Sequence, residues 1–234
     1  MSECRLILTL EATTGVIRRG VTIVHAVVAG WTGRDANAVQ RHIEELEELG
    51  VRRPLSVPAF YRISATRITL AESIEVLGAN SSGEVEFVLT QLAGELWLGV
   101  GSDHTDRTVE AYDVGVSKQI CDKPIAPHFW RFADVAAHWD SLVLRSYIGK
   151  ERVEYQTGSV AAISEPQTLV AAYRGAAHLA EGTLMFCGTL PALGGVRPGS
   201  PFAFEIEDPV LRRKIQHEYR VDALKCTRAI GELP

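Results

Sequence analysis

The apolar and polar positions of the chain form many short strand-like patterns and only two convincing helical ones. Residues 5–10 and 21–28 are rich in β-branched and aliphatic side chains, and glycines at positions 15 and 20 separate them. Further runs that favour strands lie at residues 60–63, 73–77, 84–89, 96–100, 141–148, 151–156, 183–186, 202–206 and 219–221. Such a pattern indicates a β-rich α+β protein rather than a doubly wound one.

The clearer helix is predicted at residues 36–49. Asp35 is a suitable N-cap, Gly50 a suitable stop, and Pro54 follows shortly afterwards. Val39, Ile43, Leu46 and Leu49 form its apolar stripe. A second helix is expected at residues 167–179, and a short one at residues 132–139.

His42 and Glu45 lie on the first of these helices. Residues three apart are neighbours on a helix surface, so the carboxylate can reach the imidazole. A histidine oriented by a carboxylate is a candidate general base. The alternative is a charged pair on the rim of the helix, and the local sequence alone favours that alternative.

A candidate metal site begins at Glu84 and Glu86. Residues two apart in a strand point to the same face, so these carboxylates are aimed at one place. Gly94 separates their strand from the run at 96–100, and the resulting hairpin returns Asp103 towards them. Three such carboxylates suit a hard divalent ion, Mg²⁺ or alternatively Mn²⁺ or Ca²⁺. The competing interpretation is an exposed strand face that carries two glutamates.

Composition narrows the class of protein. The 234 residues are 46% hydrophobic and 23% charged, which is ordinary for a globular protein, and the net charge of −5 gives no basic surface for nucleic acid. No apolar run approaches the ~20 residues that cross a bilayer. There is no signal-peptide pattern, and the four scattered cysteines have no metal-ligand spacing. We therefore expect a cytoplasmic protein without a membrane partner.

Several motifs occur in the order found in one enzyme family, between about residue 39 and residue 221. They are His42 with Glu45, Phe60-Tyr61-Arg62, Glu84 with Glu86, Asp103 with Arg107, Lys118 followed by Pro124 and Pro127, Gly149 followed by Gln156-Thr157-Gly158, Gly182, Cys187-Gly188-Thr189, Pro198-Gly199 and Glu205-Ile206-Glu207. On these motifs the chain resembles the fumarylacetoacetate hydrolase superfamily, whose members include acylpyruvate hydrolases, oxaloacetate decarboxylases and 2-oxo acid hydratases or isomerases.

The chain also departs from the family pattern. An Asn-Tyr pair that usually precedes the histidine is absent, the separation between Glu86 and Asp103 is short, and Cys187 replaces a threonine. His104 follows the metal aspartate where many members have an apolar residue. These differences indicate a divergent bacterial subfamily of unknown function.

The resemblance implies a mixed β-sandwich roll with a divalent metal held by Glu84, Glu86 and Asp103. His42 with Glu45 is then the general base, Lys118 and Arg107 balance negative charge on the substrate, and Thr189 binds a substrate carboxylate or oxyanion. Residues 1–75 are expected to form an N-terminal region and residues 76–234 a catalytic β-roll, together one compact unit. Family members are usually homodimers. The roles of Asp106, His104 and Glu205 stay open, because Asp106 fits a salt bridge as well as a fourth ligand.

The expected activity is metal-dependent hydrolysis of a C–C bond in a small dioxo acid such as an acylpyruvate. A decarboxylase, hydratase or tautomerase of a 2-oxo acid fits the same site. A protein that binds metal or ligand without catalysis is the remaining alternative, and it predicts that His42 points away from the metal.

Overall fold

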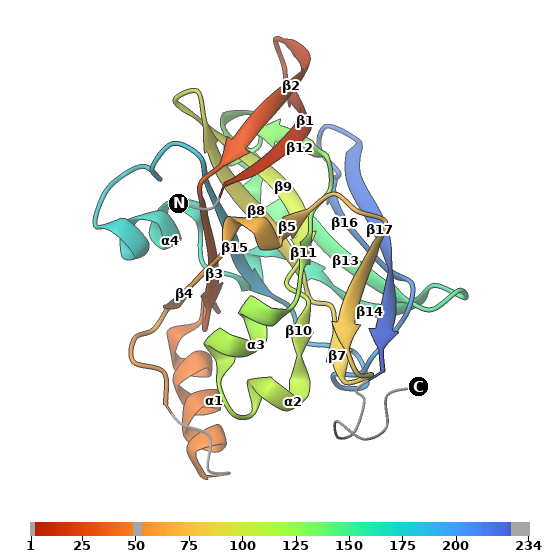
Figure 1. Cartoon of the computed structure of the whole chain (residues 1–234). Helices are drawn as coiled ribbons and strands as arrows, with labels where there is room; N and C mark the ends of the chain where they lie inside the picture. The colour runs from red at the N-terminus through yellow and green to blue at the C-terminus, as the bar shows by residue number, and fades with distance from the viewer. Residues whose placement is uncertain (1–2, 49–52, 226–234) are drawn as a thin grey trace.

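Two β-sheets of unequal size face each other across a hydrophobic core (Figure 1). The computed structural model describes residues 3–48 and 53–225. Strand β13 (Val143–Ile148) packs on β8 (Val85–Leu92), and β16 (Phe202–Asp208) packs on β9 (Glu95–Ser102). This is the β-rich α+β architecture that the sequence pattern predicted.

The larger sheet has eight strands and mixed pairing. Its order is β2 (Gly15–Ile23), β1 (Cys4–Ala12), β12 (His128–Arg131), β9, β8, β15 (Thr183–Thr189), β3 (His25–Gly30) and β4 (Ala59–Ile63). Strands from the N-terminal quarter of the chain therefore lie in the same sheet as β8 and β9.

The smaller sheet has five strands and closes the other side of the core. Its order is β14 (Val153–Ser159), β13, β16, β17 (Arg213–Leu224) and β6 (Ser73–Leu77). Two further sheets have only two short strands each. One pairs β7 (Ser81–Ser82) with β10 (Thr105–Asp106), and the other pairs β5 (Ile68–Thr69) with β11 (Lys123–Pro124).

Strand β8 is buried along its whole length because both of its faces are covered. Val85, Phe87 and Leu89 belong to the core between the sheets. Val88 belongs to a second cluster on the other face, to which buried residues of β1, β3 and β12 also belong. Alternation along the strand places Glu86 on the same face as Val88, away from the core between the sheets.

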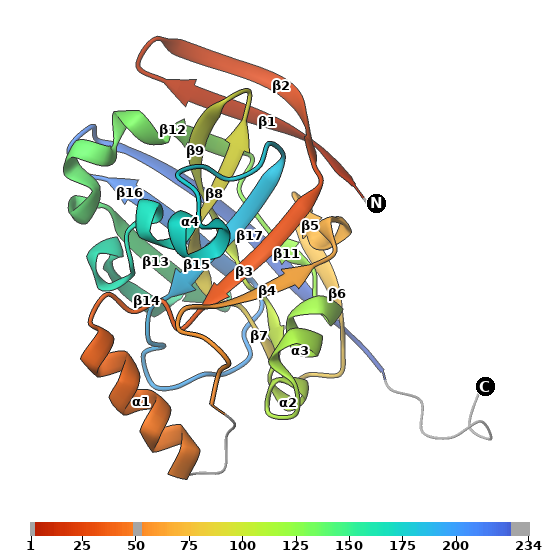
Figure 2. The ribbon, with the colours of Figure 1, turned by 90° about the vertical axis from the view of Figure 1, so that its left-hand side faces the viewer.

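The helices lie outside the sheets (Figure 2). They are α1 (Ala36–Glu48), α2 (Arg107–Glu110), α3 (Val114–Ile120) and α4 (Pro166–Arg174), with 3₁₀ turns at Ala65–Arg67, Phe132–Asp134, Ala136–Ser141 and Val160–Ala162. Asp35 caps α1 as expected, since its Oδ1 accepts from the N–H groups of Asn37 and Ala38. Among the described residues, none of the helices combines the length and the apolar character needed to span a membrane.

Some predicted element bounds were wrong. The strand predicted at 21–28 is two strands, because β2 pairs with β1 in a hairpin and β3 starts afresh at His25. Helix α4 ends at Arg174 rather than at 179, because Gly175 adopts the left-handed conformation at φ 63° and stops the helix. The short helix predicted at 132–139 is a pair of 3₁₀ turns, and α2 and α3 were not predicted.

Candidate metal and substrate site

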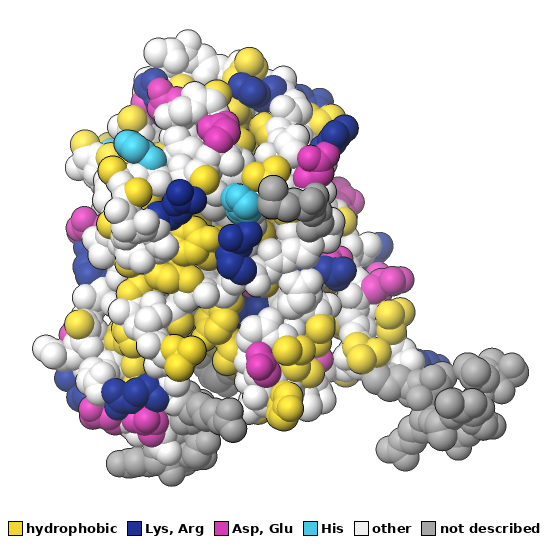
Figure 3. All heavy atoms as spheres, turned by 60° about the vertical axis from the view of Figure 1, so that its left-hand side comes forward, with side chains coloured by type: hydrophobic (Ala, Val, Ile, Leu, Met, Phe, Trp, Pro, Cys, Tyr) yellow, Lys and Arg dark blue, Asp and Glu magenta, His cyan; other side chains and the backbone are white. Residues whose placement is uncertain are grey.

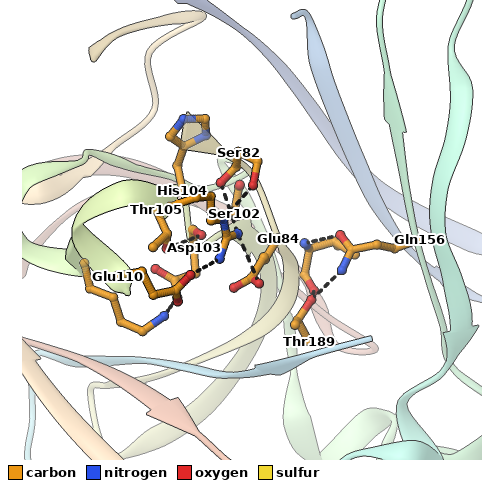
Figure 4. A network of polar contacts seen from close by, with 12 residues as sticks. Ser82, Glu84, Ser102, Asp103, His104, Thr105, Glu110, Gln156 and Thr189 are labelled. Atoms are coloured by element: carbon orange, nitrogen blue, oxygen red, sulfur yellow. Dashed lines mark hydrogen bonds and ion pairs between the residues drawn. The ribbon is translucent and has the colours of Figure 1, made fainter. Parts of the chain in front are cut away.

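Glu84, Glu86 and Asp103 meet at the end of the β8–β9 hairpin. Val85 pairs with Ser102, and the N–H of Asp103 donates to the carbonyl of Glu84 over 3.0 Å. One carboxylate oxygen from each acid can be chosen so that all three lie within 4.8 Å of one another. Figure 4 shows Glu84 and Asp103 side by side within a network of polar contacts.

Three cationic side chains contact two of these acids, Glu84 and Asp103. The Lys118 ammonium contacts Oδ2 of Asp103, and that of Lys123 lies 3.2 Å from Oδ1. The Arg107 guanidinium lies 3.1 Å from Oε1 of Glu84 and also 2.7 Å from Oε2 of Glu110. The site thus combines opposite charges in a buried position, where their interactions are stronger than in water.

Burial and neighbouring charges raise the pKa values of Glu84 and Glu86 but lower that of Asp103. Burial, and then the Asp103 charge, raises the pKa of Glu86 well above its usual 4.5. Burial also raises the pKa of Glu84, against the opposing effects of Arg107 and Lys118. For Asp103, burial acts upwards but the two lysines outweigh it and lower the pKa to about 2. Asp103 is therefore ionised near pH 7.

The lysines also differ from each other. Burial tends to lower both of their pKa values, but the charges of Asp103, Glu84 and Glu86 raise that of Lys118. For Lys123 burial prevails and its pKa is lowered, although Asp103 opposes this. The sequence did not single out Lys123 as a site residue; its only signal is a lysine directly before the apolar and proline-rich run that follows it.

A bulge in β15 supplies a hydrogen bond to Glu86. The register of β15 against β8 shifts between Phe186 and Thr189, and the N–H of Gly188 donates to Oε2 of Glu86 over 2.7 Å. Thr189 ties the same two strands together, since its hydroxyl donates to the carbonyl of Val85 over 2.8 Å. That hydroxyl also accepts from Nε2 of Gln156. The proton of the Thr189 hydroxyl is therefore already engaged in a hydrogen bond within the protein.

A cavity of about 570 Å³ opens beside the acids. Glu84, Glu86 and Lys118 line it, together with a majority of apolar or uncharged residues: Ala29, Gly30, Trp31, Thr32, Gly33, Ala38, Val39, Tyr61, Val114, Tyr155, Gln156, Ala162, Gly188, Thr189, Leu190, Pro191, Ala192 and Val196, with Glu110 as a further acid. The space-filling view in Figure 3 shows hydrophobic side chains gathered across the middle of the side that carries α1 and α4. The cavity is large enough for a small molecule.

The remaining sequence candidates lie in different places. Arg107 does not line the cavity and pairs with Glu84 and Glu110. Asp106 caps α2, with Oδ1 accepting from the N–H groups of Thr108 and Val109. Glu205 lies in β16 and pairs with Arg145 and Lys214, away from the cavity.

His104 is fully buried behind Asp103. Its Nδ1 lies 2.8 Å from the hydroxyl of Tyr219, which is also 2.8 Å from the hydroxyl of Ser102. Burial and the Lys123 charge lower the pKa of His104 to about 3, so it is neutral near pH 7. A neutral histidine is suited to this interior position; the sequence had left the role of His104 open.

His42 and Glu45 belong to the helical backbone of α1, but their side chains lie outside the described residues. Ala38 and Val39, on the preceding turn of the same helix, line the cavity. The base and its partner therefore remain sequence predictions.

Comparisons with known proteins give a family and a fold. A family model described as "Protein of unknown function (DUF2848)" matches residues 29–219. No curated protein matches the chain.

Solved structures match over nearly the whole chain. Fumarylpyruvate hydrolase from Pseudomonas aeruginosa, in complex with Mn²⁺ and pyruvate, is 15% identical with a TM-score of 0.64, covering 93% of this chain and 97% of that one. A 2-keto-3-deoxy-D-arabinonate dehydratase with magnesium and 2,5-dioxopentanoate is 16% identical with a TM-score of 0.62, covering 91% and 78%. A yeast fumarylacetoacetate hydrolase family protein is 14% identical with a TM-score of 0.56, covering 86% and 94%.

These likenesses confirm the fold expected from the sequence motifs, a rolled mixed β-sandwich of the fumarylacetoacetate hydrolase type. The family model covers more than half of the chain. The chain therefore belongs to the DUF2848 family of proteins of unknown function, and it has the fumarylacetoacetate hydrolase fold.

Proposed function

We propose that the protein is a divalent-metal-dependent hydrolase that cleaves a C–C bond in a small dioxo acid of the acylpyruvate type. The observation that carries this proposal is the meeting of Glu84, Glu86 and Asp103 within 4.8 Å beside a cavity of substrate size. Carboxylates this close repel one another, and a cation of higher charge than an ammonium satisfies all three.

The residues present fit such an ion. All three donors are carboxylate oxygens, the ligands that Mg²⁺, Mn²⁺ and Ca²⁺ prefer. Oδ1 of Asp103 is buried and has no hydrogen-bond partner among the described residues, although the Lys123 ammonium lies 3.2 Å away. Structures with this fold contain Mn²⁺ with pyruvate, or magnesium with 2,5-dioxopentanoate, which supports Mg²⁺ or Mn²⁺ here.

A bound divalent ion would supply Lewis-acid stabilisation of the negative charge that develops when the C–C bond breaks. His42, oriented by Glu45, would take a proton from water as the water oxygen adds to the acyl carbon. The bond from that carbon to the pyruvyl methylene then breaks, and the methylene carbon takes a proton. The products are a carboxylic acid and pyruvate.

Lys118 is the cation placed to meet the substrate, because it lines the cavity while it contacts Asp103. Its charge would stabilise a substrate carboxylate or a developing oxyanion. The Thr189 hydroxyl donates to Val85, so we assign Thr189 first to holding β15 on β8 and give it only an accepting role towards substrate.

Dehydration, decarboxylation or tautomerisation of a 2-oxo acid is the second candidate. The match to a 2-keto-3-deoxy-D-arabinonate dehydratase, with a TM-score of 0.62, favours it as the alternative. The same acids and the same lysine would serve either reaction.

The test is a substrate panel with the full chain and Mg²⁺ or Mn²⁺. Acylpyruvates are followed by loss of their dioxo absorbance, oxaloacetate by release of CO₂, and 2-keto-3-deoxy sugar acids by formation of the dehydrated product. Turnover of acylpyruvates that stops with a chelator supports the hydrolase. Turnover of only the other substrates favours the second candidate, and no turnover with any metal contradicts both.

A further inference from the structure

Lys123 is a fully buried lysine in contact with one of the proposed metal ligands. Its side chain is 0% exposed, its ammonium contacts the carbonyl of His104, and it lies 3.2 Å from Oδ1 of Asp103. It does not line the cavity. A buried ammonium is costly unless it is paired, so its place here is set by Asp103 and this carbonyl.

The backbone around Lys123 is held against β5. Lys123 pairs with Ile68 in the β11–β5 ladder, and the N–H of Ile125 donates to the carbonyl of Thr69 over 2.9 Å. Lys118, in contrast, borders the cavity from helix α3. Of the two ammonium groups on Asp103, only that of Lys118 has space beside it into which it can turn.

The acids already have cationic neighbours without a metal. Lys118 and Lys123 both contact Asp103, and Arg107 contacts Glu84 but is shared with Glu110 at the more exposed side. A divalent ion adds two positive charges next to a lysine that cannot withdraw. In a buried site these two added positive charges are poorly screened. A ligand with two negative charges, such as the carboxylate and enolate oxygens of a 2-oxo acid, would cancel them.

We propose that Lys123 sets the charge of the site so that tight metal binding depends on a doubly anionic ligand. This inference rests on the proposed metal site of Glu84, Glu86 and Asp103. By linkage, the metal and the dianion then raise each other's affinity by the same factor. The free protein holds the ion weakly, and the ion becomes firmly bound when a substrate of the right charge is present.

The test measures Mn²⁺ affinity by calorimetry on the full chain, with oxalate, with oxamate and with neither. Oxalate and oxamate have the same shape but carry two and one negative charges. Each enhancement is divided by the affinity of that ligand for Mn²⁺ in water. We expect the corrected enhancement in the wild type to be about tenfold or more larger for oxalate than for oxamate.

The variants K123M and K123Q remove the charge, and K150M removes a lysine from the exposed β13–β14 turn as a matched control. We expect the excess for oxalate to shrink several-fold in K123M and K123Q and to be unchanged in K150M. If Lys123 had only a structural role, its replacement would change the enhancement of Mn²⁺ affinity by oxalate and by oxamate equally. The excess for oxalate would then be unchanged, and the inference would be overturned.

The wild-type comparison can overturn the inference even if a Lys123 variant does not fold, because equal enhancement by oxalate and oxamate contradicts it. Mn²⁺ binding without that excess leaves the proposed metal site standing. A wild-type protein that binds no Mn²⁺ under any of the three conditions refutes the metal site and the inference together.

Discussion

The backbone N–H of Gly188 donates a hydrogen bond to Oε2 of Glu86 over 2.7 Å. Gly188 has φ 107°, and a Cβ placed on it would lie 1.8 Å from the Thr32 hydroxyl oxygen. The bulge in β15 therefore needs a glycine for two reasons, its backbone conformation and its close approach to Thr32. Through this contact, one acid of the proposed metal site is held by the strand on the other side of β8 from the hairpin partner β9.

The substitution G188A should destabilise the protein by about 2–4 kcal/mol, because a disfavoured backbone conformation and a steric overlap add together. The measurement is the free energy of unfolding in urea. The control is G195A, where φ is also positive at 84° but no atom lies within 4 Å of the new Cβ. It should cost about 1 kcal/mol. Equal losses for the two variants would refute the role of Thr32.

In the absence of metal, the stability of the protein should fall as the pH rises above Glu86's ordinary pKa of 4.5. The folded pKa is raised well above this value, so the folded state binds more protons than the unfolded state between the two pKa values. The free energy of unfolding, measured in chelator from about pH 5 to about pH 8, should decline with a shallower slope in E86Q. An unchanged slope would contradict the burial effect. Asp103 acts oppositely: with a pKa of about 2 it adds stability above 3.8 that is lost only as the pH falls towards 2.

Mn²⁺ at a hundred times its dissociation constant should raise the Tm of the wild type by about 5–10 °C. E86Q should lose most of this rise, because it removes one anionic ligand. The matched control is E95Q, at the exposed start of β9 in the same hairpin, and it should respond like the wild type. A full Mn²⁺ response in E86Q would remove Glu86 from the metal site.

Replacement of His42 by alanine should lower kcat by about 10²–10⁴-fold, the usual contribution of a general base, while Mn²⁺ affinity stays within about twofold. The control R41A changes the adjacent exposed residue of α1 and should keep wild-type turnover. Steady-state kinetics and a metal titration on the same preparations separate the two effects. If H42A turns over normally, the base lies elsewhere.

Acylpyruvates with an apolar acyl group should be better substrates than fumarylpyruvate, by about tenfold or more in kcat/KM. Among the described cavity residues, Lys118 is the only cation and it already contacts Asp103, so a second substrate carboxylate would meet mainly apolar side chains and Glu110. Desolvating an unpaired carboxylate is unfavourable. V196K, which places a cation at the cavity wall, should narrow the difference, and equal use of both substrates by the wild type would contradict this account.

The strand pattern predicted much of the architecture because alternation reports local burial. The runs at 84–89 and 96–100 became β8 and β9, and Gly94 lies in the turn between them at φ 80°. Errors arose where a hairpin or a glycine cap overrode composition, as in the strand at 21–28 and the end of α4. The helices α2 and α3 were missed because each is short, and their starts are fixed by Asp106 and Asp113 caps rather than by periodicity.

The amino-acid sequence by itself determined the β-rich class, the β8–β9 hairpin and the position of three acids along it, because strand period and turn residues act over a few residues. Only the tertiary structure decided which cations meet those acids. Lys123 and Gly188 come from segments distant in sequence, and no local pattern reports the charge or the hydrogen bond that each brings to the site. Long-range pairing of β11 with β5 and of β15 with β8 places them there.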